Sequence, residues 1–249
     1  MSPAEHSSTL LSSPLVLASR NEGKLRELRP LIEAAGFRGE TLVDVGIPES
    51  AEEDALEVHD TFEANALAKA RWFAALLPGR AVLADDSGLA VDALHGAPGV
   101  RSKRWSNRPE LMGAALDEAN NAMLLDALET VGAREGAPRA ATGVAGSGNA
   151  GRTARYVCAA ACIWPDARGG REFVAHGETG GVILSAPRGS GGFGYDPYFL
   201  SDELGATFAE VSREAKGAVS HRGRAFAELF RLIDAAILRR PVDPAEQGG

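Results

Sequence analysis

Cysteine is scarce in this chain: only Cys158 and Cys162 occur among 249 residues, both in the apolar run YVCAAACIW. Four residues along a strand span roughly 13 Å, which excludes a disulfide between them unless the backbone folds back. A zinc site would need more ligands than this pair supplies. We therefore expect two buried thiols on the same side of a strand, in a reducing cytoplasm.

Long apolar runs and basic stretches are also missing. No run is long enough to span a bilayer, and the opening MSPAEHSSTLLSSP lacks the basic and apolar regions of a secretory signal. Residues 1–13 and 240–249 are therefore expected to be disordered tails. The net charge of −8 argues against a nucleic-acid binder, although a few well-placed cations would be sufficient for a nucleotide site.

The spacing of apolar residues predicts an α/β fold with some antiparallel pairing. Strands are expected at residues 14–18, 41–47 and 81–84. ARYVCAAACIW and REFVAHGET should form an antiparallel pair around the turn PDARGG. Residues 132–152 contain few bulky apolar residues, and we expect them to be a flexible surface insertion within a single domain of residues 14–239.

Four helices are expected. The first follows the turn SRNEGK and ends near Gly36, and the second has Thr61 as its N-cap. The third spans about residues 116–128, and Ser220 caps the last. The residues expected to face the core of these helices are Leu25, Leu28, Ile32 and Ala35; Ala66, Ala70, Phe73 and Leu77; Leu116, Met123, Leu124 and Ala127; and Phe226, Leu229, Phe230 and Ile233.

The stretch LADDSGLAVDALHGAPGV, residues 83–100, carries the strongest functional signal. The apolar strand is expected to end abruptly at Asp85 and Asp86, and two adjacent, partly desolvated carboxylates repel each other. A divalent cation such as Mg²⁺ would relieve this repulsion, and ligand sites in open α/β sheets lie beyond the carboxyl ends of strands. A helix cap or turn formed by Asp-Asp-Ser-Gly is the structural alternative.

Two loops could bind a nucleotide. In SRNEGK, Ser19, Asn21 and Lys24 lie beside a helix N-terminus and suit a polyphosphate, although the turn could simply cap the helix and lacks the Walker A spacing. In GSGGFGYDPYF, Gly191, Gly192 and Gly194 around Phe193 allow close backbone approach, and the flat rings of Phe193 and Tyr195 suit a base. The alternative for this second loop is a tight turn with core aromatics.

The segment EAKGAVSHR adds three possible donors around the start of the last helix. Lys216 suits phosphate oxygens, while His221 and Arg222 could donate to a carbonyl. A solvated basic helix end is the alternative.

Together these motifs resemble one family, the non-canonical purine nucleoside triphosphate pyrophosphatases, also called inosine/xanthosine triphosphate pyrophosphatases or the Ham1-like family. The resemblance runs from about Leu15 to Leu238 and rests on SRNEGK, TFEANALAKA, LADDSGLAVDALHGAPGV, GSGGFGYDPYF and EAKGAVSHR. It implies an elongated mixed central sheet flanked by helices, with two lobes around a substrate cleft. It also implies a homodimer that uses Mg²⁺.

The resemblance assigns roles by position. Asp86 would be the catalytic base and a metal-associated carboxylate, with Glu57 as the second metal-associated residue. The implied substrate-binding residues are Ser19, Arg20, Asn21, Glu22, Gly23, Lys24, Ser87, Phe193, Gly194, Tyr195, Asp196, Lys216, His221 and Arg222.

The chain departs from the family pattern in the acidic region. Ala64 stands where the family usually has Glu before the Asn of its TFxENA motif, and Glu63 lies one residue earlier. The Thr-Gly that normally follows the metal-associated Glu is Val-His here, so Glu52 and Glu53 are alternatives to Glu57. The insertion at residues 132–152 is also atypical.

Our leading hypothesis is a Mg²⁺-dependent hydrolase of purine nucleoside triphosphates (ITP, dITP and XTP) that releases pyrophosphate and binds neither nucleic acid nor a membrane. The alternatives are a related pyrophosphatase for modified pyrimidine triphosphates and a nucleotide-binding regulatory protein that has lost catalysis.

Overall fold

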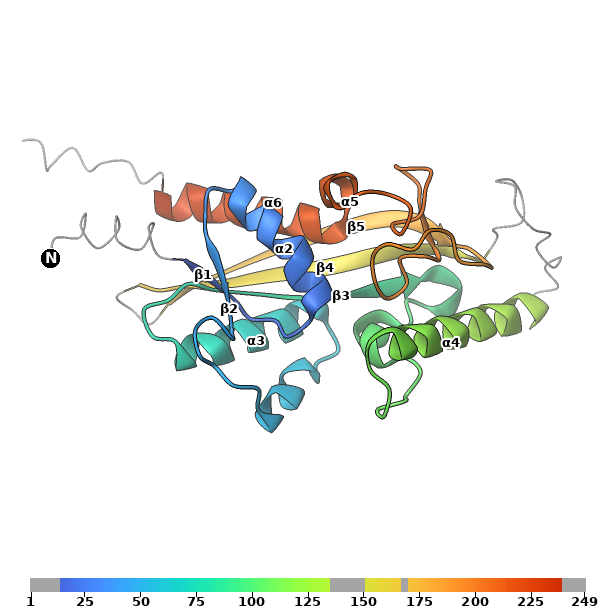
Figure 1. Cartoon of the computed structure of the whole chain (residues 1–249), viewed down its shortest axis with the longest axis horizontal. Coiled ribbons are helices and arrows are strands. Elements are labelled where there is room, and N and C mark those ends of the chain that lie inside the picture. The colour runs from blue at the N-terminus through green and yellow to red at the C-terminus, as the bar shows by residue number, and fades with distance from the viewer. Residues whose placement is uncertain (1–13, 135–150, 167–169, 239–249) are drawn as a thin grey trace, which may run out of the picture.

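The computed structural model describes residues 14–134, 151–166 and 170–238. A six-stranded sheet of order β2-β1-β3-β4-β5-β6 runs along the molecule (Figure 1). β1 pairs in parallel with β2 and β3, and the other neighbours are antiparallel. The predicted mixed α/β class is therefore confirmed. The strands are β1 Leu15–Leu17, β2 Gly39–Thr41, β3 Val82–Val91, β4 Thr153–Trp164, β5 Arg171–Ile183 and β6 Phe199–Ser201.

Helices cover both faces of this sheet, with α2 and α6 on one face and α3 on the other (Figure 1). The α-helices are α2 Glu22–Ala34, α3 Phe62–Leu76, α4 Gly113–Arg134, α5 Arg213–Val219 and α6 His221–Ile233. Short turns of helix are η1 Ala51–Glu57, η2 Asp92–Leu94, η3 Gly99–Arg104 and η4 Asp234–Leu238. In the described ranges, no helix combines the length and the apolar character that a bilayer crossing requires.

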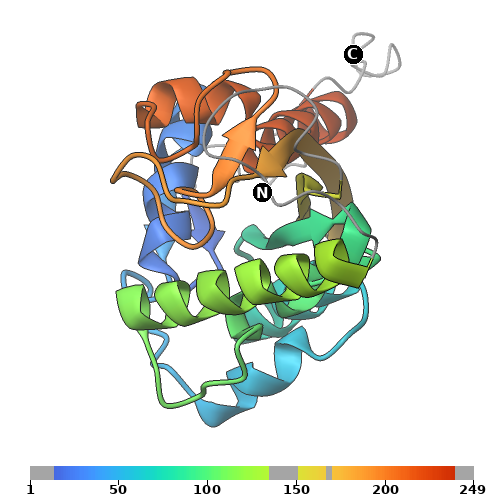
Figure 2. The ribbon, with the colours of Figure 1, turned by 90° about the vertical axis from the view of Figure 1, so that its right-hand side faces the viewer.

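The alternation of side chains along β4 separates two apolar cores. Cys158 and Cys162 pack toward α2 and α6, whereas Ala159 and Ala161 pack toward α3. Both thiols are free and buried, as the sequence predicted. A third core lies at the far end of β3 and β4, where α4 packs with the loop that leads into β6 (Figure 2). The two ends of the sheet thus form the two expected lobes.

Capping side chains fix the helix starts that the sequence predicted. Thr61 Oγ1 accepts a hydrogen bond from the amide of Ala64 (3.2 Å), and Ser220 Oγ accepts one from Gly223 (3.0 Å). Such bonds satisfy amides that have no partner within the helix.

The predicted strand at 41–47 is wrong beyond Thr41. Residues 42–46 form turns, because the Asp44 carboxylate accepts hydrogen bonds from both the amide and the hydroxyl of Thr41 (each 2.8 Å) and so reverses the chain. Val43 is consequently 77% exposed.

The predicted strand at 81–84 is too short. β3 continues through both aspartates to Val91, because β4 pairs with it residue by residue from Val82 onward. The two carboxylates therefore lie within a strand rather than at its end.

The buried face of α4 is shifted from the predicted one. Met123 is 43% exposed, while Leu124 and Leu128 are buried. The helix also runs on to Arg134, and Arg152 is tied by its Nε to the carbonyl of Ile183 (2.6 Å). The ends of the predicted insertion are thus ordered. Its middle, like the two predicted tails, lies outside the described residues.

Candidate active site

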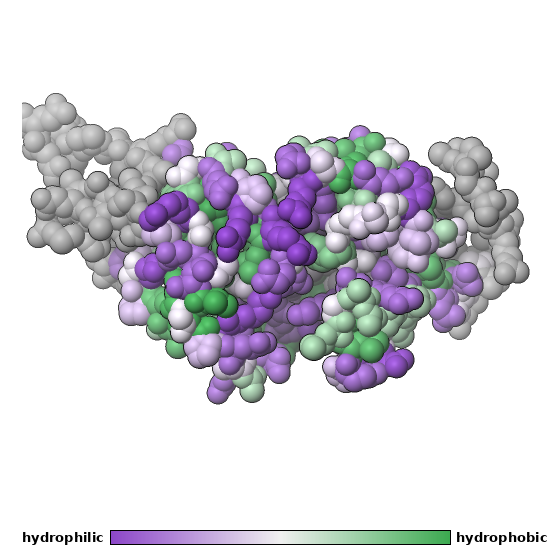
Figure 3. Space-filling model, viewed as in Figure 1, coloured by the Kyte–Doolittle hydropathy of each residue, from purple (hydrophilic) through white to green (hydrophobic). Residues whose placement is uncertain are grey.

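The site lies where β1 stops and β3 continues. The pairing of these two strands ends at Leu17 and Leu83, so the next part of β3 borders open space instead of a strand. A cavity of about 500 Å³ occupies this position, at the carboxyl end of the parallel pair. Figure 3 shows the hollow between the two halves of the molecule. Eight basic and seven acidic side chains line the cavity, so it is richer in cations than the whole chain.

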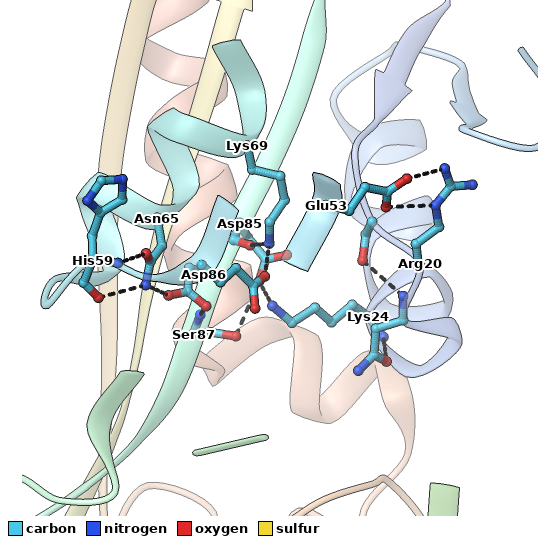
Figure 4. Close-up of polar contacts among 12 residues, drawn as sticks. Arg20, Lys24, Glu53, His59, Asn65, Lys69, Asp85, Asp86 and Ser87 are labelled. Carbon is cyan, nitrogen blue, oxygen red and sulfur yellow. Dashed lines mark hydrogen bonds and ion pairs between the residues drawn. The ribbon is translucent and has the colours of Figure 1, made fainter. Parts of the chain in front are cut away.

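Asp85 points toward α2 and α6, where two cations hold it. Its Oδ2 lies 3.1 Å from Lys24 Nζ and 3.2 Å from Arg222 Nε (Figure 4 shows the lysine). The side chain is fully buried. Burial acts to raise the pKa of Asp85, but Lys24 and Arg222 outweigh it and the pKa lies well below its usual range. Asp85 is a permanent anion beneath the cavity.

Asp86 points the other way and lines the cavity. Asn65 Nδ2 donates to its Oδ2 (2.9 Å), and the amide of Ser87 donates to its Oδ1 (3.0 Å; Figure 4). Burial raises the pKa of Asp86, and the nearby Glu57 carboxylate raises it further despite Lys24. Of the two aspartates, only Asp86 is disposed to take up a proton.

The SRNEGK turn brings Ser19, Arg20, Asn21 and Lys24 to the cavity wall. The alternative role of this turn also holds, since Asn21 Oδ1 caps α2 by accepting from the amide of Lys24 (3.1 Å). The Arg20 guanidinium donates to both oxygens of Glu53 (2.7 and 3.1 Å).

Two residues of the turn do not line the cavity. Glu22 is exposed and Gly23 is buried. A Cβ on Gly23 would meet the Phe193 ring at 2.7 Å, so this glycine permits an aromatic ring to pack on α2.

The acidic segment contributes Glu57 to the cavity. Its carboxylate pairs with Lys69, whose Nζ also donates to the backbone carbonyl of Asp85 (3.0 Å). Of the two alternatives, Glu53 is paired with an arginine of the SRNEGK turn and Glu52 is exposed. Glu63 lies outside the cavity lining, 3.3 Å from His176.

The glycine-rich loop of residues 189–198, which we call the aromatic loop because it carries Phe193 and Tyr195, forms the opposite end of the cavity. Asp196 Oδ2 accepts hydrogen bonds from Lys216 Nζ (2.5 Å) and from the amide of Phe193 (2.9 Å). The Phe193 ring lies over Lys216, 5.1 Å from its Nζ. Tyr195 OH donates to the carbonyl of Ser102 (2.8 Å), which joins the loop to η3.

His221 and Arg222 differ in availability. The His221 ring stacks on Tyr156 at 4.6 Å, and burial together with Arg222 lowers its pKa well below the usual value, so it is neutral. Its Nδ1 is buried and has no partner among the described residues. Arg222 donates to Glu27, Asp85 and Ser87, and its side chain is 2% exposed.

Several lining or supporting residues were missed by sequence reasoning. Asn65 and Lys69 follow Thr61 at spacings of four on α3, so a polar stripe beside the apolar face was a readable signal. Glu27 lies three residues after Lys24 and pairs with Lys216 (2.7 Å). Other lining residues come from segments with no such signal: Lys103, Arg104, Asn107, Arg108, Asp117, Asn120 and Tyr156.

The described residues contain no group of three or more His, Cys, Asp or Glu side chains that could hold a metal ion alone. Asp86 and Glu57 are nevertheless close enough for one carboxylate to raise the pKa of the other. Mg²⁺ requires few protein ligands, because substrate phosphates and water complete its shell. The donor set therefore fits a Mg²⁺ ion that arrives with a polyphosphate.

The fold and the site define a class: a mixed α/β protein with a cation-rich cleft, a protonatable carboxylate and an aromatic loop at the far end. The chain belongs to the Ham1 family, whose model matches residues 15–232. The family resemblance inferred from the sequence is thereby confirmed.

Relatives and solved structures agree with this assignment. The chain is 47% identical over 219 residues to the dITP/XTP pyrophosphatase of Frankia alni, covering 88% of this chain and 96% of that protein. It is 47% identical over 215 residues to the dITP/XTP pyrophosphatase of Geobacter sulfurreducens, covering 86% and 94%. A HAM1 protein from Coxiella burnetii superposes with a TM-score of 0.67 at 32% identity, covering 90% and 99%.

Proposed function

We propose that this protein hydrolyses non-canonical purine nucleoside triphosphates, namely ITP, dITP and XTP, to the monophosphate and pyrophosphate. The observation that carries the proposal is the placement of Asp86, held by Asn65 and the amide of Ser87, in a cleft that Lys24 and Lys69 also line. The names of the relatives from Frankia alni and Geobacter sulfurreducens support the substrate class.

The chemistry follows from the residues around Asp86. Its carboxylate takes a proton from a water molecule while the water oxygen bonds to the α-phosphorus. The bond from that phosphorus to the bridging oxygen breaks, and pyrophosphate leaves with the electron pair. A raised pKa makes Asp86 a better proton acceptor, and Lys24 and Lys69 neutralise charge that develops on the phosphate oxygens.

Mg²⁺ is part of the proposal, with Asp86 and Glu57 as its protein ligands. When bound, the ion would neutralise phosphate charge and orient the leaving group. Lys69 already pairs with Glu57, so it would compensate for that carboxylate whenever the ion is absent.

We assign the choice of base to the end of the cavity that the aromatic loop and His221 line. Hypoxanthine and xanthine carry a carbonyl at position 6, where adenine has an amino group. A neutral His221 has one ring N–H to donate, and a donor facing the adenine amino group would be left without a partner, which costs about 1–3 kcal/mol. GTP shares the 6-carbonyl, so its rejection requires that its 2-amino group finds no room or partner. We therefore expect ITP and XTP well above GTP, and ATP lowest.

The test is pyrophosphate release from ITP, dITP, XTP, GTP, ATP and modified pyrimidine triphosphates, with Mg²⁺ and with a chelator. The proposal requires Mg²⁺-dependent release that is fastest for the deaminated purines. Preference for a pyrimidine would support the related pyrophosphatase instead, and binding without release would indicate a regulatory protein. Homodimerisation and a cytoplasmic location are further proposals, testable by light scattering and by fractionation.

A further inference from the structure

We propose that Asp117 and Asn121 of α4 are positioning residues that hold the aromatic loop and thereby set the base selectivity of the cleft. This inference rests on the proposed function for its choice of substrate. It concerns residues that contact the loop, not the reacting atoms.

The two side chains form hydrogen bonds to the same residue of the aromatic loop, Gly194. Asp117 Oδ2 accepts a hydrogen bond from the amide of Gly194 (2.8 Å), and Asn121 Nδ2 donates one to the carbonyl of the same glycine (2.9 Å). Residues four apart lie on the same face of a helix. Asn121 Nδ2 also donates to the carbonyl of Asp117 (2.8 Å), and Asn121 is only 6% exposed. We call this pair of side chains the α4 clamp.

Gly194, the residue that both side chains contact, lies at the centre of the aromatic loop. This loop forms the end of the cavity to which we assign the base. Gly194 has a φ of +63°, a conformation that favours glycine. Its neighbour Phe193 packs on Gly23 and over Lys216. Two residues after Gly194, the Asp196 carboxylate accepts a hydrogen bond from the amide of Phe193. A displacement at Gly194 therefore moves the ring and the carboxylate together.

The clamp crosses between the parts of the molecule that border the cleft. Figure 2 shows α4 running beneath the loop, while α2 lies beyond it. Phe193 reaches α2 and Gly194 reaches α4, so the loop bridges the two walls. The phosphate-side residues Lys24 and Asp86 have no hydrogen bond or ion pair to the clamp among the described contacts. Loss of the clamp should therefore affect the base more than the phosphates.

One side chain of the clamp accepts a hydrogen bond and the other donates one. Two isosteric variants therefore have opposite expected effects. Asp117→Asn retains an oxygen that can accept from the Gly194 amide. Asn121→Asp replaces the donor with a second acceptor, which repels the Gly194 carbonyl. Matched controls on the exposed side of the same helix are Asp126→Asn and Ala122→Asp.

The experiment measures, for wild type and each variant, the KM and kcat for ITP and ATP. Calorimetry adds the binding of ITP against inorganic triphosphate, which has no base. For Asn121→Asp, and for Asp117→Ala, we expect KM for ITP to rise about tenfold, the size of one lost hydrogen bond. The ITP-to-ATP ratio should fall, while triphosphate binding changes less than twofold. Asp117→Asn and both controls should stay near wild type.

Unchanged ITP selectivity in folded Asn121→Asp would overturn the inference, as would equal effects of Asp117→Asn and Asp117→Ala. The binding arm separates this inference from the proposed function. A wild type that binds ITP more tightly than triphosphate without hydrolysing it would refute catalysis alone, and the variants would still test the clamp. If wild type binds the two ligands equally, the loop makes no base contact and the inference fails.

Discussion

On the two faces of β3, chemically identical aspartate side chains have pKa values shifted in opposite directions. Asp85 and Asp86 are adjacent, so the strand directs them to opposite faces. Asp85 meets Lys24 and Arg222 and has a lowered pKa, whereas Asp86 meets Asn65 and the field of Glu57 and has a raised one. Both are buried, so burial alone does not distinguish them.

The difference shows how one dipeptide can serve two purposes. The charge of Asp85 holds Lys24 and Arg222 in place beneath the cleft. Asp86, supported mainly by neutral donors, keeps the ability to accept a proton. Asp85 therefore has a structural role and Asp86 a chemical one, and the first two predictions below separate these two contributions.

The largest effect is expected for Asp86→Asn. The change preserves size but removes the proton acceptor, so kcat for ITP should fall about 10²–10⁴-fold or more. Because the variant also removes a buried carboxylate that is repelled by Glu57, its unfolding free energy should not decrease. Turnover above about a tenth of wild type at saturating Mg²⁺ would contradict the role.

Asp85→Asn should act chiefly on stability. It leaves Lys24 and Arg222 without their shared carboxylate, and breaking a buried ion pair costs roughly 3–5 kcal/mol. Urea unfolding monitored by circular dichroism measures this loss. A variant as stable as wild type, yet inactive, would show that Asp85 takes part in the chemistry and would erase the distinction between the two faces.

Lys24→Ala tests the residue whose charge acts on both aspartates. The lysine should bind phosphate in the ground state and in the transition state alike, so KM for ITP should rise roughly tenfold with a smaller fall in kcat. Affinity for the monophosphate product should change less. The exposed neighbour Arg26→Ala is the control. Equal losses for triphosphate and monophosphate would place Lys24 away from the polyphosphate.

The smallest effect concerns pH and His221. Its folded pKa lies well below that of an unfolded histidine, about 6.5. As the pH falls below that value, the unfolded chain gains a proton first, so the folded state loses stability by up to about 1.4 kcal/mol per pH unit. His221→Gln should reduce this slope, and the exposed His59→Gln should not. Identical slopes in wild type and His221→Gln would exclude the assignment.

The sequence predicted the elements whose signals are local. Thr61 and Ser220 are recognisable caps, and the apolar run that contains Cys158 and Cys162 predicted a strand with both thiols on one face. The predicted strand ended too early, before Asp85. Pairing with β4 keeps the polar residues of β3 extended, and no local sequence pattern reveals that pairing.

The residues of the candidate site likewise fall into those with a local sequence signal and those without one. Lys24, Asp86 and the aromatic loop stand out by residue type and spacing, and the structure brings them to one cavity. Asp117 and Tyr156 reach that cavity only through the packing of α4 and β4. Their side chains show no distinctive spacing along the chain, so tertiary structure was needed to find them.

The proposed reaction requires that the oxygen of a water molecule bonds to the α-phosphorus of the substrate. Hydrolysis of ITP in water enriched in oxygen-18, followed by mass spectrometry of both products, tests it directly. Attack at the α-phosphorus places one heavy oxygen in the nucleoside monophosphate and none in the pyrophosphate. Label in the pyrophosphate, or release of nucleoside diphosphate and labelled phosphate, would contradict it.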